Sequence, residues 1–125
     1  MSLIKDYDNY FLPADNLDAA KTFYQQRLEL DIKFDFADKG MVAFKVGDSE
    51  PAIILRKGDN VKPAIVFEVD DVRQAVKDLK TKGVQFLNEP IEIMTGLMVE
   101  FTDPFGNKLA LTDYSKKPDL RGKKK

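Results

Sequence analysis

Two carboxylates and two cations are the side chains of this sequence best suited to chemistry. Glu68 and Glu100 can serve as general acid and base if a cavity raises the pKa of one of them. Lys45 and Arg56 can hold an anionic substrate. The chain has no His and no Cys, so a Ser/His/Asp triad or a Cys/His pair is impossible. The sequence shows no nucleophile with an adjacent base. Glu68 and Glu100 are therefore the only catalytic candidates.

Two stretches with helical periodicity are the first elements that can position these groups. In the first, apolar residues recur at spacings of three and four: Leu17, Ala20, Phe23, Tyr24 and Leu28. Either Asp15 or Asn16 can cap its first turn. The second repeats the pattern with Val72, Ala75, Val76 and Leu79. Asp70 and Asp71 precede it, and Gly83 is expected to end it. Each helix should pack one face on a sheet.

Segments with a period of two residues surround both helices and predict strands. Before and after the first helix the alternating residues are Tyr10, Leu12 and Ala14; Ile32, Phe34 and Phe36; Val42, Phe44 and Val46; Ile53 and Leu55. Around the second helix they are Ile65, Phe67 and Val69; Val84 and Phe86; Leu97, Val99 and Phe101; Leu109 and Leu111. Each half of the chain is thus a strand, a helix and three strands.

The two halves correspond by residue number. Leu17 and Val72 are 55 residues apart, as are Phe44 and Val99. Such a repeat predicts an α+β protein of two tandem βαβββ modules that pair into one curved, largely antiparallel sheet, with the helices on its convex side. Residues 1–115 should form a single domain, with modules at 1–58 and 62–115. The basic segment 116–125 has almost no apolar residue and is predicted to be a disordered tail.

Side chains that alternate with the helix-packed ones should line the concave face of this sheet. The candidate ligand-binding residues on it are Asn9, Phe11, Lys45, Ile54, Arg56, Ala64, Glu68, Met98, Glu100 and Ala110. Apolar surface with a few charges is typical of a small-molecule pocket. The alternative is that the charged residues only form solvated ion pairs across a wet sheet face.

The overall composition limits the kinds of partner that this protein is expected to bind. The 20 Lys and Arg residues balance 21 Asp and Glu residues, which gives no electrostatic reason to expect nucleic acid. No run approaches about 20 apolar residues, so no membrane partner is expected. The lack of Cys, and of an apolar N-terminal signal region, favours a cytoplasmic location.

Two sequence runs resemble a known family. FLPADNLDAAKTFYQQRLEL, residues 11–30, resembles the opening strand and helix of vicinal oxygen chelate proteins, the glyoxalase/bleomycin resistance/dioxygenase superfamily. VEFTDPFGNKLAL, residues 99–111, resembles the DPxGN hairpin between the last two strands of that superfamily. Asp, Pro and Gly at these spacings also form ordinary tight turns, so the resemblance depends on the hairpin together with the module repeat.

The resemblance implies four positions where metalloenzymes of the superfamily carry His, Gln or Glu ligands. Here these positions hold Asn9, Ile54, Ala64 and Ala110. Three of them lack a donor atom, and a catalytic transition metal normally takes about three protein ligands. We therefore expect no metal and no other cofactor. An oxygen-only Mg²⁺ or Ca²⁺ site remains an alternative, although the carboxylates have no loop-type spacing.

These observations give three hypotheses. The first is a metal-independent protein, similar to the bleomycin-resistance branch, that sequesters a small, partly apolar compound in a concave cavity. The resemblance also implies a homodimer. The second is a metal-free lyase or isomerase that uses Glu68 and Glu100. The third is a protein-interaction or regulatory module without a ligand.

Overall fold

The computed structural model of the chain describes residues 3–58 and 61–120. These residues form two compact units. We call residues 9–58 with 61–64 the first unit, and residues 3–8 with 65–120 the second unit. Strand β1, Ile4–Pro13, contributes residues to both units. That residues 1–115 act as a single domain stays a prediction.

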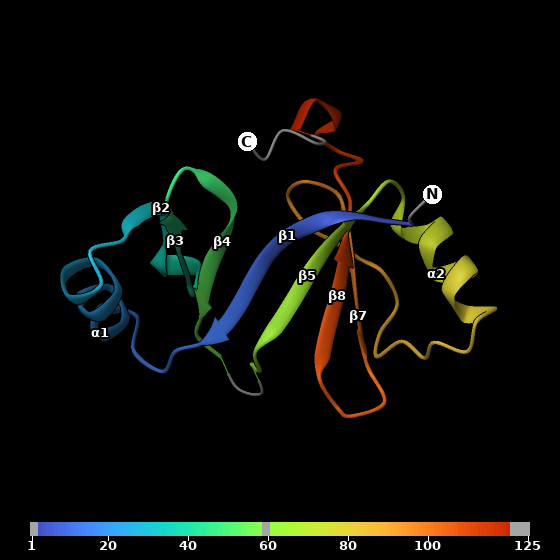
Figure 1. Cartoon of the computed structure of the whole chain (residues 1–125), viewed down its shortest axis with the longest axis horizontal. Helices are drawn as coiled ribbons and strands as arrows, with labels where there is room; N and C mark the ends of the chain where they lie inside the picture. The colour runs from blue at the N-terminus through green and yellow to red at the C-terminus, as the bar shows by residue number, and fades with distance from the viewer. Residues whose placement is uncertain (1–2, 59–60, 121–125) are drawn as a thin grey trace. The chain divides into compact units, whose positions relative to one another are not determined.

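The first unit is a four-stranded mixed sheet with one helix (Figure 1). Its elements after β1 are α1 (Leu17–Lys21), the π-helical turn η1 (Thr22–Arg27), β2 (Asp31–Phe36), the 3₁₀ turn η2 (Ala37–Lys39), β3 (Met41–Val46) and β4 (Ser49–Arg56). The strands lie in the order β2-β3-β4-β1. β1 and β4 are parallel, and the other two pairs are antiparallel.

The second unit repeats the same element order. It contains β5 (Ala64–Val69), α2 (Val72–Lys80), β6 (Ile91–Glu92), β7 (Leu97–Thr102), β8 (Lys108–Thr112) and the 3₁₀ turn η3 (Pro118–Leu120). Its strands follow the order β1-β5-β8-β7-β6, and the pairs that join β7 to β6 and to β8 are antiparallel. The predicted α+β class and the βαβββ order of elements are therefore confirmed.

Side-chain caps explain where both helices begin. Asn16 Oδ1 accepts a hydrogen bond of 3.0 Å from the backbone N–H of Ala19, so Asn16 and not Asp15 caps α1. Asp71 does the same for the N–H of Gln74, at 3.1 Å, and caps α2. Past α2, Gly83 adopts a left-handed conformation with φ of 89°, as expected for a glycine that ends a helix.

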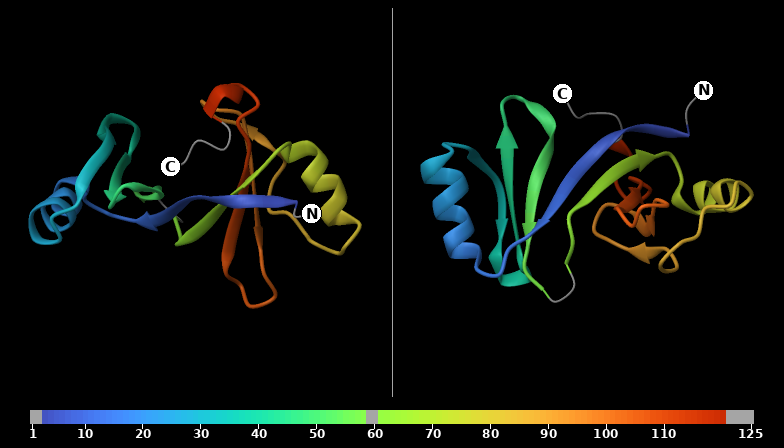
Figure 2. Two further views of the ribbon diagram at one scale, coloured as in Figure 1. Left: turned by 45° about the horizontal axis from the view of Figure 1, so that its top comes forward. Right: turned by 60° about the horizontal axis from the view of Figure 1, so that its bottom comes forward.

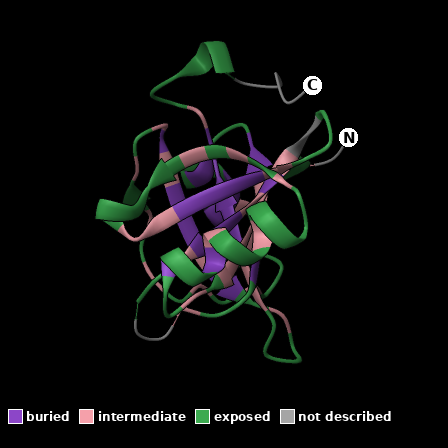
Figure 3. Ribbon diagram, turned by 90° about the vertical axis from the view of Figure 1, so that its left-hand side faces the viewer, coloured by how far each residue is buried: buried purple, intermediate pink, exposed green. Residues whose placement is uncertain are grey.

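An apolar cluster joins the helix of each unit to its strands. In the first unit Leu17 and Ala20 of α1 pack on Val42, Phe44 and Leu55. Figure 2 shows α1 running beside these strands, and Figure 3 shows the exposed outer side of the helix in front of the buried strands. The corresponding cluster of the second unit consists of Val69, Val72, Ala75, Val76, Val99, Phe101 and Leu111. These are the side chains that the periodicity assigned to the helix-covered faces.

The predicted strand at Val84 and Phe86 is wrong. Phe86 forms only an isolated bridge with Phe101, and strand β6 begins later, at Ile91. Between them the Oδ1 atom of Asn88 accepts the backbone N–H of Glu100 at 2.9 Å. A side chain thus replaces a main-chain carbonyl in the ladder, and regular pairing is interrupted.

The C-terminal segment is described as far as Leu120, and its predicted disorder stays a prediction. Residues 118–120 form η3, and Lys116 Nζ lies 2.6 Å from Glu92 Oε1. The rest of the predicted disordered tail, residues 121–125, lies outside the described residues. No helix among the described residues is long and apolar enough to cross a bilayer.

Candidate functional site

The first unit presents an apolar sheet face on the side opposite α1. Ile53 and Leu55 of β4 pack in the cluster of α1, whereas Ile54 belongs to a separate cluster with Ala43 and Ala52. Phe11, Phe34 and Met41 pack against this second cluster. The alternation predicted for β1, β3 and β4 therefore holds.

Strand register aligns these residues into one row across the unit. Phe34 pairs with Ala43, Ala43 with Ile54, and Ile54 with Phe11. The row thus has an aromatic ring on β2 and another on β1, with smaller side chains on β3 and β4 between them. Because Ala43 is completely buried and Ile54 is only 5% exposed, Phe11 and Phe34 supply most of the surface that a ligand can touch.

Phe34 was assigned to the wrong face by simple alternation. The pairing of β2 with β3 shifts between Ile32 and Phe34, which marks a β-bulge. Ile32 therefore packs toward α1, and Asp35 accepts a hydrogen bond of 2.9 Å from Lys21 in that helix. Phe34 faces the opposite way and stacks on Phe36, with 4.8 Å between the ring centroids.

Arg56 is a charged group that lies beside this row. Its guanidinium carbon lies 4.8 Å from the centroid of the Phe11 ring, within the range of a cation–π contact. Pro13 and Met41 occupy the paired positions on the two neighbouring strands. The cation is therefore half-buried against apolar side chains.

In the second unit the corresponding face, opposite α2, is more polar. Glu100 Oε2 forms an ion pair of 3.1 Å with Lys108 Nζ, and both side chains are about one-fifth exposed. The main chain of Glu100 pairs with that of Ala110 on β8. Glu68 of β5 is only 2% exposed, although its neighbours Phe67 and Val69 take part in the cluster of α2. The predicted carboxylates are thus both present on this face, one ion-paired and one buried.

The ten predicted ligand-binding residues divide by burial. Those with less than one-tenth of their surface exposed are Ile54, Ala64, Glu68, Met98 and Ala110. Those that remain half-buried are Asn9, Phe11, Lys45, Arg56 and Glu100. Five of the ten therefore have side chains that solvent reaches, and a cavity above them stays a prediction.

The four positions that the resemblance aligns with metal ligands provide few donor atoms for a cation. Ile54, Ala64 and Ala110 are apolar and buried. The amide oxygen of Asn9 accepts the backbone N–H of Ala52 at 3.2 Å. Across the described residues no group of three or more Asp or Glu side chains is arranged to hold a metal ion. The donor set therefore does not fit a transition-metal centre.

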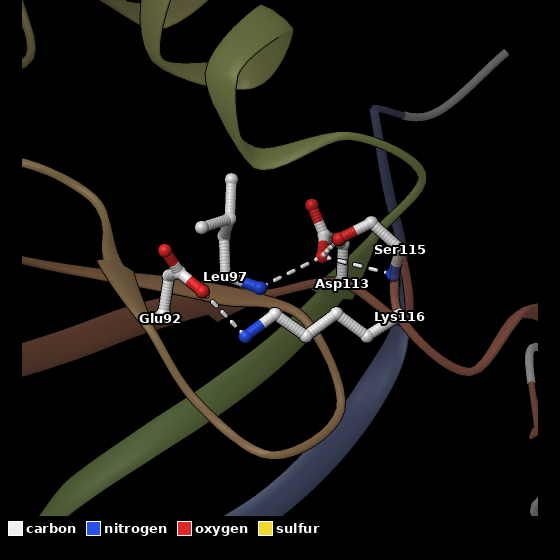
Figure 4. Close-up of polar contacts among 5 residues, drawn as sticks. All are labelled: Glu92, Leu97, Asp113, Ser115 and Lys116. Atoms are coloured by element: carbon white, nitrogen blue, oxygen red, sulfur yellow. Dashed lines mark hydrogen bonds and ion pairs between the residues drawn. The ribbon is translucent and has the colours of Figure 1, made fainter.

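Sequence reasoning missed the best-connected carboxylate of the second unit, Asp113. It follows β8, is 1% exposed, and accepts hydrogen bonds from the backbone N–H groups of Val72, Leu97 and Ser115 at 2.8–3.1 Å. The Ser115 hydroxyl donates a fourth at 2.8 Å (Figure 4). Burial alone would raise the pKa of Asp113, but these bonds outweigh it and hold the pKa below its ordinary value. No residue spacing signals this role, because the donors come from three separate segments.

The hairpin between β7 and β8 has the tight structure expected of its sequence. Asp103 Oδ1 accepts the backbone N–H groups of Phe105 and Asn107, each at 2.9 Å. Its other carboxylate oxygen accepts the Asn107 side-chain amide at 2.8 Å. The hydrogen bond from that amide is the largest of the contributions that lower the pKa of Asp103. Gly106 has φ of 87°, which completes the turn. The carboxylate organises the loop and is not a free catalytic group.

Comparison with known proteins identifies the family. Residues 7–111 match the Glyoxalase/Bleomycin resistance protein/Dioxygenase superfamily. The chain belongs to this superfamily.

Among relatives, the uncharacterized protein YetH of Bacillus subtilis (strain 168) is 28% identical over 120 residues, which cover 89% of this chain and all of YetH. Methylmalonyl-CoA epimerase from Mycobacterium tuberculosis has a similar structure, with a TM-score of 0.73, 18% identity, and coverage of 96% of this chain and 95% of the epimerase. The 2,3-dioxygenase LapB from Pseudomonas sp. KL28 matches with a TM-score of 0.70 and 25% identity over 91% of this chain and 42% of its own.

Proposed function

We propose that this protein binds a small, partly apolar organic compound without the help of a metal ion. The proposal rests on which side chains occupy the four positions where the resemblance implies metal ligands. Three of them are buried apolar side chains, and the amide oxygen of Asn9 is already hydrogen-bonded. Polar donors at these positions would be needed for the metal chemistry of glyoxalase or dioxygenase enzymes.

The first unit supplies the complementary surface. The face of Phe11, Phe34 and Met41 is apolar, and Arg56 stands at its border. Rings and a single cation of this kind hold an organic compound by dispersion and orient it by charge. The name of the superfamily includes bleomycin resistance, and sequestration of a compound is the form of activity that needs no reactive group.

Metal analysis and ligand screening test the proposal together. We expect freshly purified full-length protein to contain far less than one equivalent of any transition metal by elemental mass spectrometry. We also expect a thermal-shift screen of small organic compounds to give hits whose affinity is unchanged by EDTA. A ligand at about 100 times its dissociation constant stabilises by roughly 2.7 kcal/mol, which such a screen detects. Stoichiometric metal, or loss of every hit on chelation, would overturn the proposal.

A second candidate function is metal-free catalysis by a lyase or isomerase. The burial of Glu68 favours it, because a carboxylate with 2% exposure on a ligand-facing strand can act as a base. Glu100 is less suited, because Lys108 is ion-paired to it. Each carboxylate is tested by its Glu-to-Gln substitution, assayed with the compounds that the screen identifies. If Glu68→Gln still binds a compound from the screen but no longer converts it, catalysis by Glu68 is established. If the wild type converts none of these compounds, catalysis is excluded.

The assembly and the third hypothesis are tested in the same preparation. By resemblance we propose a homodimer, which light scattering coupled to size-exclusion chromatography measures directly. If the screen yields no ligand at all, the hypothesis of a protein-interaction or regulatory role is favoured over small-molecule binding.

A further inference from the structure

Arg56 occupies an unusual environment for a charged side chain. Register places it in a row across the four strands of the first unit, with Met41 beside it on β3 and Pro13 beside it on β1. Phe36 continues the row on β2, opposite Met41. The neighbouring row is the apolar one that runs from Phe34 to Phe11. No acidic side chain stands next to Arg56 in either row.

The guanidinium has no carboxylate partner within the part of the chain that the structure describes. The guanidinium carbon instead lies 4.8 Å from the centroid of the Phe11 ring. A ring attracts the cation but accepts none of its five N–H donors in the way that a carboxylate does. Asp35, which follows Phe34 on β2, pairs instead with Lys21 on the helix side of the sheet. A half-buried guanidinium therefore keeps its hydrogen-bonding edge for another acceptor.

Three aromatic side chains lie on the same face of the first unit as this cation. Phe34 and Phe36 stack on strand β2, with 4.8 Å between their ring centroids, and Phe11 lies on β1. Strands β2 and β1 are three strand spacings apart, roughly 14 Å. That width suits a ligand with one planar ring or a branched apolar body.

We propose that Arg56 is the carboxylate-binding residue of the ligand site, and that the ligand is an organic anion with an aromatic or similarly apolar body. The inference rests on the proposed small-molecule binding and specifies its ligand class. The planar guanidinium matches a carboxylate through two parallel hydrogen bonds, while Phe11, Phe34 and Phe36 contact the apolar body. Lys45, half-buried on β3, adds positive charge to the same unit.

A pair of matched probes tests the ligand class on the intact protein. Benzoate and benzamide have the same ring and nearly the same shape, but only benzoate carries a carboxylate. We expect benzoate to bind at least about tenfold more tightly and to shift the Arg56 Nε–Hε resonance in a ¹H–¹⁵N spectrum. Equal affinities, or a benzoate-induced shift confined to other arginines, would overturn the proposal.

Three variants locate the interaction. Arg56→Gln should lower benzoate affinity at least about tenfold and leave benzamide affinity unchanged. Arg56→Lys, which keeps the charge but loses the planar fork, should fall between Arg56→Gln and the wild type. Lys39→Gln removes one charge from an exposed residue of the same unit and should leave both affinities unchanged.

The outcomes separate this inference from the proposed function. If neutral compounds bind in the screen while benzoate shows no preference over benzamide, the carboxylate assignment fails and small-molecule binding stands. If Arg56→Gln and Lys39→Gln weaken benzoate equally, the effect is general electrostatics and the assignment also fails. If no small molecule of any class binds, the proposed function itself fails. Melting temperatures within a few degrees of the wild type verify that each variant is folded.

Discussion

The carboxylate of Asp113 accepts a hydrogen bond of 2.8 Å from the backbone N–H of Val72, the first residue of helix α2, although 41 residues separate them in sequence. The first N–H groups of a helix have no partner within the helix, and they carry partial positive charge. Asp71 caps the N–H of Gln74, and Asp113 supplies a second acceptor from the end of β8. One buried carboxylate thus ties the helix to the last strand of its unit.

Replacement of Asp113 by Asn should therefore lower the free energy of unfolding by about 2–4 kcal/mol at neutral pH. The amide keeps one acceptor oxygen but turns its N–H₂ group toward backbone donors. Urea denaturation followed by circular dichroism measures the change. Asp119→Asn, at an exposed position of η3, removes the same charge and should change stability by less than about 0.5 kcal/mol. Equal effects in the two variants would contradict the role of Asp113.

The lowered pKa of Asp113 makes the stability difference between the wild type and Asp113→Asn depend on pH. Because the pKa is lower in the folded than in the unfolded protein, the carboxylate stabilises the fold fully above its unfolded value of about 3.9. This stabilisation is lost as the pH falls through the folded pKa. The wild type and Asp113→Asn should thus converge in stability below about pH 4, when urea titrations are repeated from pH 6 downward. A difference that stays constant, or grows, in acid would rule out this linkage.

Gly96 is required for a steric reason that involves the same carboxylate. A Cβ atom at this position would lie 2.5 Å from the Asp113 carbonyl oxygen and 2.9 Å from the Ser115 nitrogen, and would also clash with the Asp113 carboxylate. Gly96→Ala should cost about 3 kcal/mol or more, because backbone atoms cannot move away cheaply. Gly83→Ala is the control, since its Cβ meets nothing within 4 Å and the cost, from a positive φ, is about 1 kcal/mol. Thermal unfolding that ranked Gly83→Ala as the more harmful would contradict this account.

Tyr114 and Asp8 form a second polar contact in this unit. The Tyr114 hydroxyl donates a hydrogen bond to Asp8 Oδ1, and Asp8 is 8% exposed. Tyr114→Phe should cost about 1–3 kcal/mol, because the buried carboxylate loses a donor. Tyr24→Phe is the matched control, since the Tyr24 ring stacks on Phe44 and its hydroxyl has no hydrogen bond among the described residues. Chemical denaturation should show a change below about 0.5 kcal/mol for Tyr24→Phe, and similar losses in both variants would refute the role of the hydroxyl.

Local patterns predicted those features of the fold whose causes lie close together in sequence. Apolar spacing located both helices, and the residue types Asn16, Asp71 and Gly83 marked their ends. Alternation also assigned Ile54 and Phe11 to the face opposite α1. The module repeat and the hairpin at Asp103 together indicated the family.

Features that depend on contacts between distant segments could not be predicted. Asp113 receives its hydrogen bonds from Val72, Leu97 and Ser115, so its role exists only after the strands have assembled. The need for glycine at position 96 has the same origin. The strand expected at Val84 and Phe86 is absent because the Val84 N–H donates to the Leu79 carbonyl at the end of α2, and further on the Asn88 side chain takes a position in the ladder. A period of two cannot reveal such a replacement.

The β-bulge between Ile32 and Phe34 leads to the last prediction. Uninterrupted alternation would place both side chains beneath α1, but the bulge leaves Ile32 there and turns Phe34 to the face of Arg56. Both side chains are half-buried, so Ile32→Ala and Phe34→Ala should each cost about 1–3 kcal/mol of stability. Only Phe34→Ala should weaken the binding of benzoate, by roughly three- to tenfold, since an aromatic contact contributes about 0.5–1.5 kcal/mol. Calorimetric titration of both variants at a temperature where each is folded measures the effect. Weaker binding in Ile32→Ala and none in Phe34→Ala would place the ligand on the wrong side of the sheet for this proposal.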